Sequence, residues 1–174
     1  ATEETDVEIK PGCFLLTDTG AGFYEGSTDI TRTYALGDVP AIMKEHFTLV
    51  LISNLRLGVA RFKYGVNSTN VDIITRTPFW ERDLDYNHGT GHGVGYLLNI
   101  HEGPSGIRWR SMPMDNQPFE AGMVITDEPG LYIDGSHGIR LENELLVVNG
   151  TKNEYGQFMH FEPITFIPMD LDAV

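Results

Sequence analysis

The sequence predicts an α+β fold, because strand-type runs gather towards its two ends and helix-type periodicity is confined to its middle. Five apolar or β-branched runs have strand length, at residues 13–18, 28–34, 123–126, 139–148 and 161–167. Residues 40–65 instead carry apolar side chains at helical spacing. A chain of 174 residues can bury a core of its own. We therefore expect residues 1–174 to form a single domain.

The first two strand runs are expected to pair as a hairpin, because Glu25-Gly26 between them has turn chemistry. Asp18 and Asp29 lie on its two arms. A turn centred between Phe23 and Tyr24 would set the aspartates opposite one another. A turn centred on Glu25-Gly26 would offset them unless a glycine forms a bulge. The sequence leaves both registers open.

Two helices are expected to follow the hairpin. Pro40 suits the first turn of a helix, and we expect this helix to end at Gly65. Ser68 or Asn70 would cap a second helix, which Thr77-Pro78 would either stop or restart.

Residues 87–95 read Asn-His-Gly-Thr-Gly-His-Gly-Val-Gly. Glycine at this density is normally tolerated where backbone turns sharply or approaches something closely, and we expect a metal or a substrate to be the neighbour. His88 and His92 are four residues apart, and His101 follows. Three imidazoles near acidic segments predict ligation or catalysis, with ordinary surface or core histidines as the alternative.

The last part of the chain is expected to contain a loop and three strands. Three prolines between residues 103 and 119 predict the loop. The strand at 123–126 runs into Glu128, where Pro129 and Gly130 force a turn. Residues 139–148 read as one long strand with Arg140, Glu142 and Glu144 on one face. Pro163 and Pro168 place the final strand, 161–167, at an edge or in irregular pairing.

Composition excludes several classes of function. With 12 basic and 25 acidic residues the formal charge is −13, which disfavours nucleic acid as a partner. No apolar run approaches the roughly 20 residues that a membrane span requires. The single cysteine, Cys13, fits a reducing compartment, and we expect a cytoplasmic protein. The chain begins at Ala1 without a starting Met, which indicates a piece of something longer.

The acidic residues and one histidine form a candidate metal set. Two aspartates on a hairpin, one histidine in a glycine-rich strand and two glutamates near strands give four carboxylates and one imidazole. Such ligands favour harder divalent ions and also admit manganese, cobalt or zinc. Bridging carboxylates can hold two metals and a shared water that becomes hydroxide near neutral pH. Taken alone, the two aspartates are more often solvated strand-edge or turn residues than metal ligands.

Five motifs follow one another along nearly the whole chain. They are Asp18-Thr19-Gly20-Ala21 with Thr28-Asp29-Ile30-Thr31-Arg32-Thr33, His88-Gly89-Thr90-Gly91-His92-Gly93-Val94-Gly95, Asn99-Ile100-His101-Glu102-Gly103-Pro104, Asp127-Glu128-Pro129-Gly130-Leu131-Tyr132 and Gly138-Ile139-Arg140-Leu141-Glu142-Asn143. In this order they resemble the catalytic domain of Xaa-Pro aminopeptidase (aminopeptidase P), a pita-bread metallopeptidase family. The resemblance implies a curved, mostly antiparallel sheet with helices on its outer face. It also implies truncation at the N-terminal side, so that residues 1–174 are the C-terminal portion of a pita-bread catalytic domain.

The resemblance also implies a site with two divalent metal ions, manganese first, with zinc or cobalt as alternatives. The implied ligands are Asp18, Asp29, His92, Glu128 and Glu142. Asp29 and Glu142 would touch both ions or bridge them.

Neighbouring residues receive roles from the same resemblance. His88 and His101 would line the pocket, bind the substrate carbonyl and stabilise the tetrahedral intermediate, without being ligands. Glu128 would also act as proton shuttle for the bridging hydroxide. Tyr132 and Arg140 would fix the orientation of the carboxylates, the alternative being a packed tyrosine and an ordinary strand-face ion pair. The glycines would leave room for a peptide beside the strand.

The implied activity is that of a metal-dependent exopeptidase that releases the N-terminal residue from peptides with proline in second position. The alternatives are a prolidase-like X-Pro dipeptidase, or a non-catalytic pita-bread binding module if the chain holds no metal. The implied partner is a peptide substrate, with no nucleic acid and no membrane. A homodimeric parent protein is a further expectation.

Overall fold

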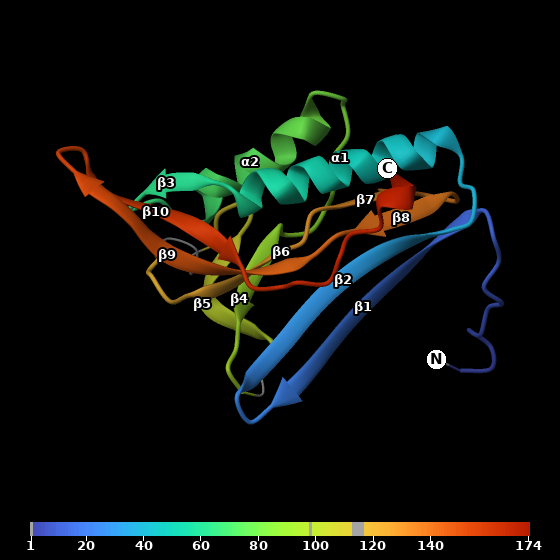
Figure 1. Cartoon of the computed structure of the whole chain (residues 1–174), viewed down its shortest axis with the longest axis horizontal. Coiled ribbons are helices and arrows are strands. Elements are labelled where there is room, and N and C mark those ends of the chain that lie inside the picture. Colours follow the sequence, from blue (N-terminus) through green and yellow to red (C-terminus); the bar gives the residue numbers. More distant parts are fainter. Residues whose placement is uncertain (1, 98, 113–116) are drawn as a thin grey trace.

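The computed structural model describes residues 2–97, 99–112 and 117–174, which form antiparallel sheets covered by two helices (Figure 1). The helices are α1 (Ala41–Gly58) and α2 (Ser68–Trp80), and a short 3₁₀ helix, η2, covers Leu171–Ala173. The strands are β1 (Cys13–Phe23), β2 (Gly26–Leu36), β3 (Arg61–Lys63), β4 (Gly91–Val94), β5 (His101–Ile107), β6 (Val124–Asp127), β7 (Gly130–Ile133), β8 (His137–Arg140), β9 (Asn143–Asn153) and β10 (Gly156–Pro163).

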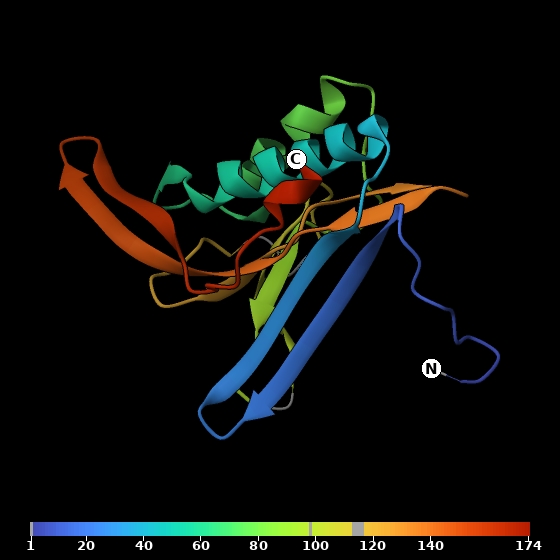
Figure 2. The same ribbon diagram turned by 45° about the vertical axis from the view of Figure 1, so that its right-hand side comes forward.

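The described strands form three sheets. One is the β1–β2 hairpin, one has six strands in the order β3-β10-β9-β6-β4-β5, and one is the β7–β8 pair. Both helices lie on one side of these sheets, while the β1–β2 hairpin extends away from them (Figure 2). This arrangement confirms the predicted α+β class.

The hairpin has a register between the two that the sequence left open. Phe23 pairs with Gly26, so the turn is centred between Tyr24 and Glu25. Asp18 consequently faces Thr31, while Asp29 faces Gly20. The two aspartates are diagonal neighbours on one face of the hairpin, close enough for their carboxylates to share a site without a bulge.

The predicted long strand at 139–148 is wrong, because the chain changes sheet within it. β8 ends at Arg140 and pairs with β7, whereas β9 begins at Asn143 and pairs with β6 and β10. At the break, the N–H of Leu141 donates to the carbonyl of Pro129, and the N–H of Glu142 donates to the carbonyl of Thr31. Glu142 therefore lies between sheets and not within a strand.

The final strand also differs from the prediction of 161–167. β10 starts earlier, at Gly156, and ends at Pro163, whose missing N–H cannot extend the ladder. It lies between β3 and β9, so it is not an edge strand, but its pairing with β9 is irregular between Gln157 and Met159, in line with the other alternative. Of the predicted loop at 103–119, residues 103–107 belong to β5, and Pro113 lies outside the described residues.

The C-terminal end of α1 and the N-cap of α2 differ from the prediction. α1 ends at Gly58, well before Gly65, because Arg61–Lys63 forms β3 against β10. The N-cap of α2 is Asn67, whose N–H donates to Oδ1 of Asn70 over 3.2 Å. Pro78 lies inside the last turn of α2, which continues to Trp80.

The core has two parts, and α1 contributes to both. Leu57 packs with β6 and β9 residues such as Ile125 and Leu145. Phe47 packs with β7 and β8 residues such as Leu131 and Ile139. α1 thus packs against the β7–β8 sheet and, further along, against the six-stranded sheet. No helix in the described part of the chain is long and apolar enough to span a membrane.

Candidate metal centre

The five predicted ligands meet where the three sheets approach one another. Asp18 lies in β1 and Asp29 in β2. His92 lies in β4, Glu128 follows β6, and Glu142 precedes β9. The side chains are therefore fixed by separate elements that only the folded chain brings together.

Potential ligand atoms of these residues form overlapping groups in which all atoms lie within 4.8 Å of one another. The groups are His92, Glu128 and Glu142; Asp18, Asp29 and Glu142; and Asp29, His92 and His101. Glu142 is shared by the first two groups, and Asp29 by the last two. This sharing gives the cluster room for two neighbouring cations.

The hydrogen bonding of His92 suits a metal ligand. Its Nδ1 lies 3.0 Å from the carbonyl oxygen of Gly93, and because a carbonyl only accepts, Nδ1 carries the proton. The lone pair is then on Nε2, which lies 3.4 Å from Oδ2 of Asp29 and 3.5 Å from Oε1 of Glu128. Such an imidazole, oriented through its other nitrogen, is the usual form of a metal-binding histidine.

Asp29, Glu128 and Glu142 are held in surroundings that disfavour their charge. Burial raises the pKa of Glu128 to about 7, with Asp29 and Asp18 adding to the rise. Burial, followed by the nearby charge of Glu128, raises the pKa of Glu142 to about 8. The pKa of Asp29 is raised as well, mainly by burial. Divalent cations would relieve this repulsion, so the residues present fit the pair of metal ions that the sequence implied.

Arg140 is the cation that the chain itself supplies to this cluster. Its Nη2 donates to Oδ2 of Asp18, its Nε donates to Oγ1 of Thr31 over 3.2 Å, and Nε lies 3.9 Å from Oε2 of Glu128. Burial alone would lower the pKa of Arg140, but hydrogen bonds with Tyr132 and Asp18 raise it. Arg140 is therefore permanently charged and orients carboxylates on two sides.

His88 and Tyr132 extend this network away from the ligands. Nδ1 of His88 lies 2.7 Å from the carbonyl oxygen of Gly89, so Nε2 is the acceptor that faces the hydroxyl of Tyr132 at 2.9 Å. Nη1 of Arg140 donates to the same hydroxyl over 3.1 Å. Burial lowers the pKa of His88, which keeps the ring neutral near pH 7.

His101 lies closer to the ligands than His88 does. Its ring centre is 4.1 Å from that of His92, and its side chain is exposed. Its geometry admits it as a partner of Asp29 and His92 around an ion, in addition to the pocket-lining place expected from the sequence.

Three glycines of the histidine stretch allow neighbouring backbone to approach closely. A Cβ atom on Gly91 would lie 1.8 Å from the carbonyl oxygen of Thr126, and one on Gly93 would lie 2.1 Å from that of Glu102. On Gly95 it would lie 1.7 Å from the carbonyl oxygen of Asn99. The Cβ positions of these three glycines are filled by neighbouring backbone, while Gly89 and Gly91 also line a hollow beside His92, so room for a peptide beside the strand stays a prediction.

The structure adds residues that sequence reasoning did not assign to the site. Thr31 donates its hydroxyl to Oε2 of Glu142 over 2.7 Å, and Oε1 of Glu144 accepts the N–H of Asp29 over 2.9 Å. Glu144 is 8% exposed, so its carboxylate is a buried group with a backbone partner. In the sequence, only the alternate spacing of Glu142 and Glu144 pointed to the contact between Glu144 and Asp29.

A buried ion-pair network in α2 contacts the backbone of the glycine-rich histidine stretch at residues 87–95. Arg76 is 0% exposed, and its Nε lies 2.6 Å from Oδ2 of Asp72. Nη2 of Arg76 donates to the carbonyl of His88 over 2.8 Å. Further along the same stretch, the carbonyl of Thr90 accepts the N–H of Glu128 over 2.7 Å. This network links α2 to the backbone of two site residues.

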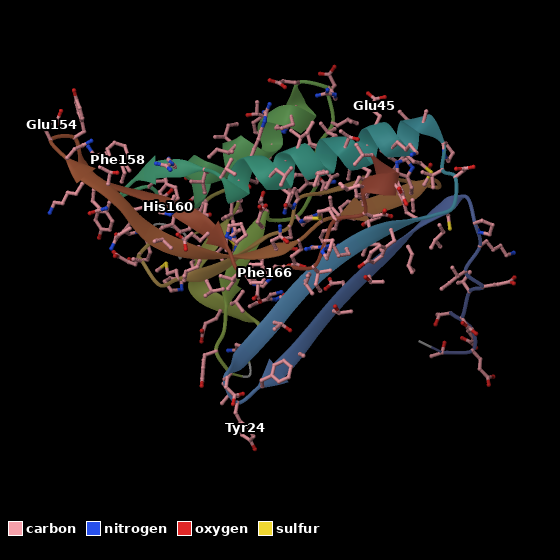
Figure 3. All side chains as sticks on the ribbon, in the orientation of Figure 1. Tyr24, Glu45, Glu154, Phe158, His160 and Phe166 are labelled. Atoms are coloured by element: carbon pink, nitrogen blue, oxygen red, sulfur yellow. The ribbon has the colours of Figure 1, made fainter. Side chains whose placement is uncertain are left out.

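Two hollows open at the cluster. One has a volume of about 620 Å³ and is lined by His88, His92, His101, Glu128, Tyr132 and Arg140, among others. The other has about 920 Å³ and lies along the hairpin, with Asp18, Asp29 and His101 on its wall and Phe23, Tyr24 and Leu97 further out. Tyr24 projects from the hairpin tip (Figure 3). An extended ligand of peptide size therefore has space on both sides of His101.

An α+β fold that gathers four carboxylates and one imidazole at the junction of its sheets is typical of metal-dependent hydrolases with two ions. The sequence profile of Metallopeptidase family M24 matches residues 1–149, and the chain belongs to this family.

Relatives agree with this assignment. The chain is 44% identical over 175 residues to "Aminopeptidase P1" of Arabidopsis thaliana, a match that covers 98% of this chain and 27% of that protein. Among solved structures it resembles an X-prolyl aminopeptidase from Caenorhabditis elegans, described as a cytosolic enzyme with a di-nuclear active site, at 38% identity and a TM-score of 0.85. That match covers 92% of this chain and 26% of the other.

A Xaa-Pro dipeptidase from Bacillus anthracis is similar at 33% identity and a TM-score of 0.76, covering 94% of this chain and 42% of that one. These similarities confirm the pita-bread fold class. The chain spans about a quarter of the length of the Arabidopsis relative.

Proposed function

We propose that the protein containing this chain is a metal-dependent aminopeptidase that releases the N-terminal residue from peptides with proline in second position. The observation that carries the proposal is the convergence of Asp18, Asp29, His92, Glu128 and Glu142 from three sheets into overlapping ligand groups. The similarity to proteins named as X-prolyl aminopeptidase and aminopeptidase P supports the substrate class.

Under this proposal, these five residues would hold two divalent ions. Manganese is the proposed metal, and zinc or cobalt are the alternatives that the donor set admits. When bound, such ions supply Lewis-acid activation of water and of the scissile carbonyl.

The remaining steps fall to the chain's own side chains. Glu128 accepts a proton from the attacking water and passes it to the leaving amine. His101 faces the peptide from the pocket wall and stabilises the negative charge that develops on the carbonyl oxygen. His88 lines the same wall, but its Nδ1 proton is donated to Gly89 and its Nε2 accepts from Tyr132, so it has no free N–H for that oxygen. Tyr132 and Arg140 hold His88 and the carboxylate of Asp18 in place.

The two hollows on either side of His101 support binding of an extended peptide. A proline residue has no N–H to satisfy, so its ring suits an apolar wall without a hydrogen-bond acceptor. We further propose that residues 1–174 fold as one domain and that the protein is cytoplasmic, as the C. elegans relative is described to be.

The test uses the full-length protein with added Mn²⁺. An aminopeptidase of this kind cleaves the first bond of an X-Pro-X tripeptide, whereas cleavage of X-Pro dipeptides alone would assign a prolidase activity instead. Metal analysis of the wild type against Asp29→Ala gives an independent result. We expect two ions in the wild type and fewer in the variant, and equal, negligible metal in both would contradict a metalloenzyme.

A further inference from the structure

Asn54 is a buried amide near the C-terminal end of α1, where this helix reaches the six-stranded sheet. Its side chain is 1% exposed. Nδ2 donates to the carbonyl oxygen of Asp127 over 2.9 Å and to that of Leu141 over 3.3 Å. One amide group therefore joins the end of β6 to the link between β8 and β9.

Each of these carbonyls belongs to the residue directly before a proposed ligand. Asp127 precedes Glu128 at the end of β6, and Leu141 precedes Glu142 in the link between β8 and β9. A shift of either carbonyl moves the adjoining glutamate. The distance between Glu128 and Glu142 is consequently coupled to the position of a single side chain.

The orientation of the Asn54 amide is fixed from its other end. Its Oδ1 accepts a hydrogen bond from Nδ2 of Asn143 over 3.0 Å, and Oδ1 of Asn143 accepts from Nη2 of Arg32 over 2.8 Å. Because the guanidinium of Arg32 only donates, both amides have only one satisfied orientation. Arg32 also donates to the carbonyls of Thr31 and Glu142, so the backbone is held on both sides of Glu142.

We propose that Asn54 is a positioning residue that sets the spacing of Glu128 and Glu142 and thereby keeps the site competent for two ions. This inference rests on the proposed function, because it assumes that these glutamates bind metal. The amide touches neither ligand side chain. It acts through the backbone immediately before each of them.

The discriminating variant is Asn54→Asp in the full-length protein, which keeps the side-chain shape but replaces the donor by an acceptor. An added negative charge by itself would attract cations, so weaker binding points to lost positioning. We expect the affinity for Mn²⁺, measured by titration calorimetry, to fall about 10- to 100-fold, the usual effect of removing a residue that orients a metal ligand. The electron paramagnetic resonance signal of a coupled Mn²⁺ pair should also be replaced by that of isolated ions.

The neighbouring Ser53 provides a matched control. It is equally buried in α1, but its hydroxyl donates to the carbonyl of Thr75 in α2, away from the ligands. Ser53→Ala should lower thermal stability and leave the affinity for Mn²⁺ and the coupled signal unchanged. Equal losses of affinity in Ser53→Ala and Asn54→Asp would overturn the inference, because they would reflect general loosening of α1.

A second variant covers the case in which Asn54→Asp does not fold. Asn54→Ser is smaller and reaches at most one of the two carbonyls, so we expect a smaller loss of affinity. Wild-type affinity and a coupled pair in folded Asn54→Ser would reject the positioning role. A wild-type protein that binds no Mn²⁺ would reject the proposed function itself, and the two failures are therefore distinguishable.

Discussion

The Nε2 atom of His88 lies 2.9 Å from the hydroxyl oxygen of Tyr132, which comes from the other side of the cluster on β7. The hydroxyl donates to His88 and accepts from Arg140, which in turn donates to Asp18. A continuous chain of hydrogen bonds thus runs from a neutral imidazole on the pocket wall to a proposed metal ligand. A change at Tyr132 should be felt at both ends of this chain.

We predict that Tyr132→Phe lowers peptidase activity about 10- to 100-fold while the protein stays folded, because the ring is kept and only the shared hydroxyl is lost. Steady-state kinetics on an X-Pro-X tripeptide would measure this effect. Tyr155→Phe, on an exposed tyrosine at the β9–β10 turn, is the control and should behave as the wild type. Unchanged kcat and KM in Tyr132→Phe would show that the hydroxyl has no part in the site.

We predict that the metal-free protein loses stability as the pH rises from 6 to 8. Burial raises the folded-state pKa of Glu142 from 4.5 to about 8. The folded protein then holds a proton that the unfolded chain has released, so the stability present below pH 4.5 is lost as pH rises towards 8.

Urea unfolding in the presence of a chelator would measure this change. A difference of one pKa unit between the folded and the unfolded state corresponds to about 1.4 kcal/mol of unfolding free energy. Glu142→Gln, which stays neutral, should reduce the slope and leave the part that Glu128 contributes, and excess Mn²⁺ should reverse the dependence in the wild type. Identical slopes for wild type and Glu142→Gln would contradict the raised pKa.

We predict that Gly91→Ala destabilises the fold by about 1–3 kcal/mol or more, because its Cβ would lie 1.8 Å from the backbone oxygen of Thr126 and force β4 away from β6. Gly22→Ala is the matched strand control. Among the described atoms nothing lies within 4 Å of its Cβ position. Thermal or urea unfolding of the two variants should separate them clearly, and equal stabilities would refute the close approach at Gly91.

We predict that Arg76→Met costs about 3–5 kcal/mol of unfolding free energy, because it leaves the buried carboxylate of Asp72 without its ion-pair partner. The double variant Arg76→Met with Asp72→Asn should recover part of the loss. Arg56→Met, on the exposed face of α1, is the control with little expected effect. Chemical unfolding would measure all three, and a cost under about 1 kcal/mol for Arg76→Met would argue against a structural ion pair.

Sequence patterns predicted most elements and the convergence of the site, but not the points where the chain changes sheet. Alternation ran unbroken through residues 139–148, yet the backbone N–H groups of Leu141 and Glu142 bond to Pro129 and Thr31. These partners are distant in sequence, and no local propensity encodes them. For the same reason, helical spacing predicted α1 but missed β3, whose pairing depends on β10.

The proposed ligands could be predicted because metal binding requires particular residue types. The residues that position these ligands can be of many types, so the sequence does not single them out. Asn54 appeared in the sequence only as one position of a helix, and Arg76 gave no signal at all. Both are buried polar groups whose partners include backbone carbonyls. A carbonyl is present at every residue, so a sequence cannot identify which one a buried amide or guanidinium will bind.

The hairpin, the six-stranded sheet and the links around the β7–β8 sheet each supply part of the ligand set, and this has a consequence for the order of folding. Asp29 and Glu142 are separated by more than a hundred positions, so a chain that has formed only one sheet contains only part of the cluster. A refolding chain should regain its strand and helix content before it regains Mn²⁺ binding. The rate of Mn²⁺ binding would then report the last step of folding, in which separately formed sheets pack against one another.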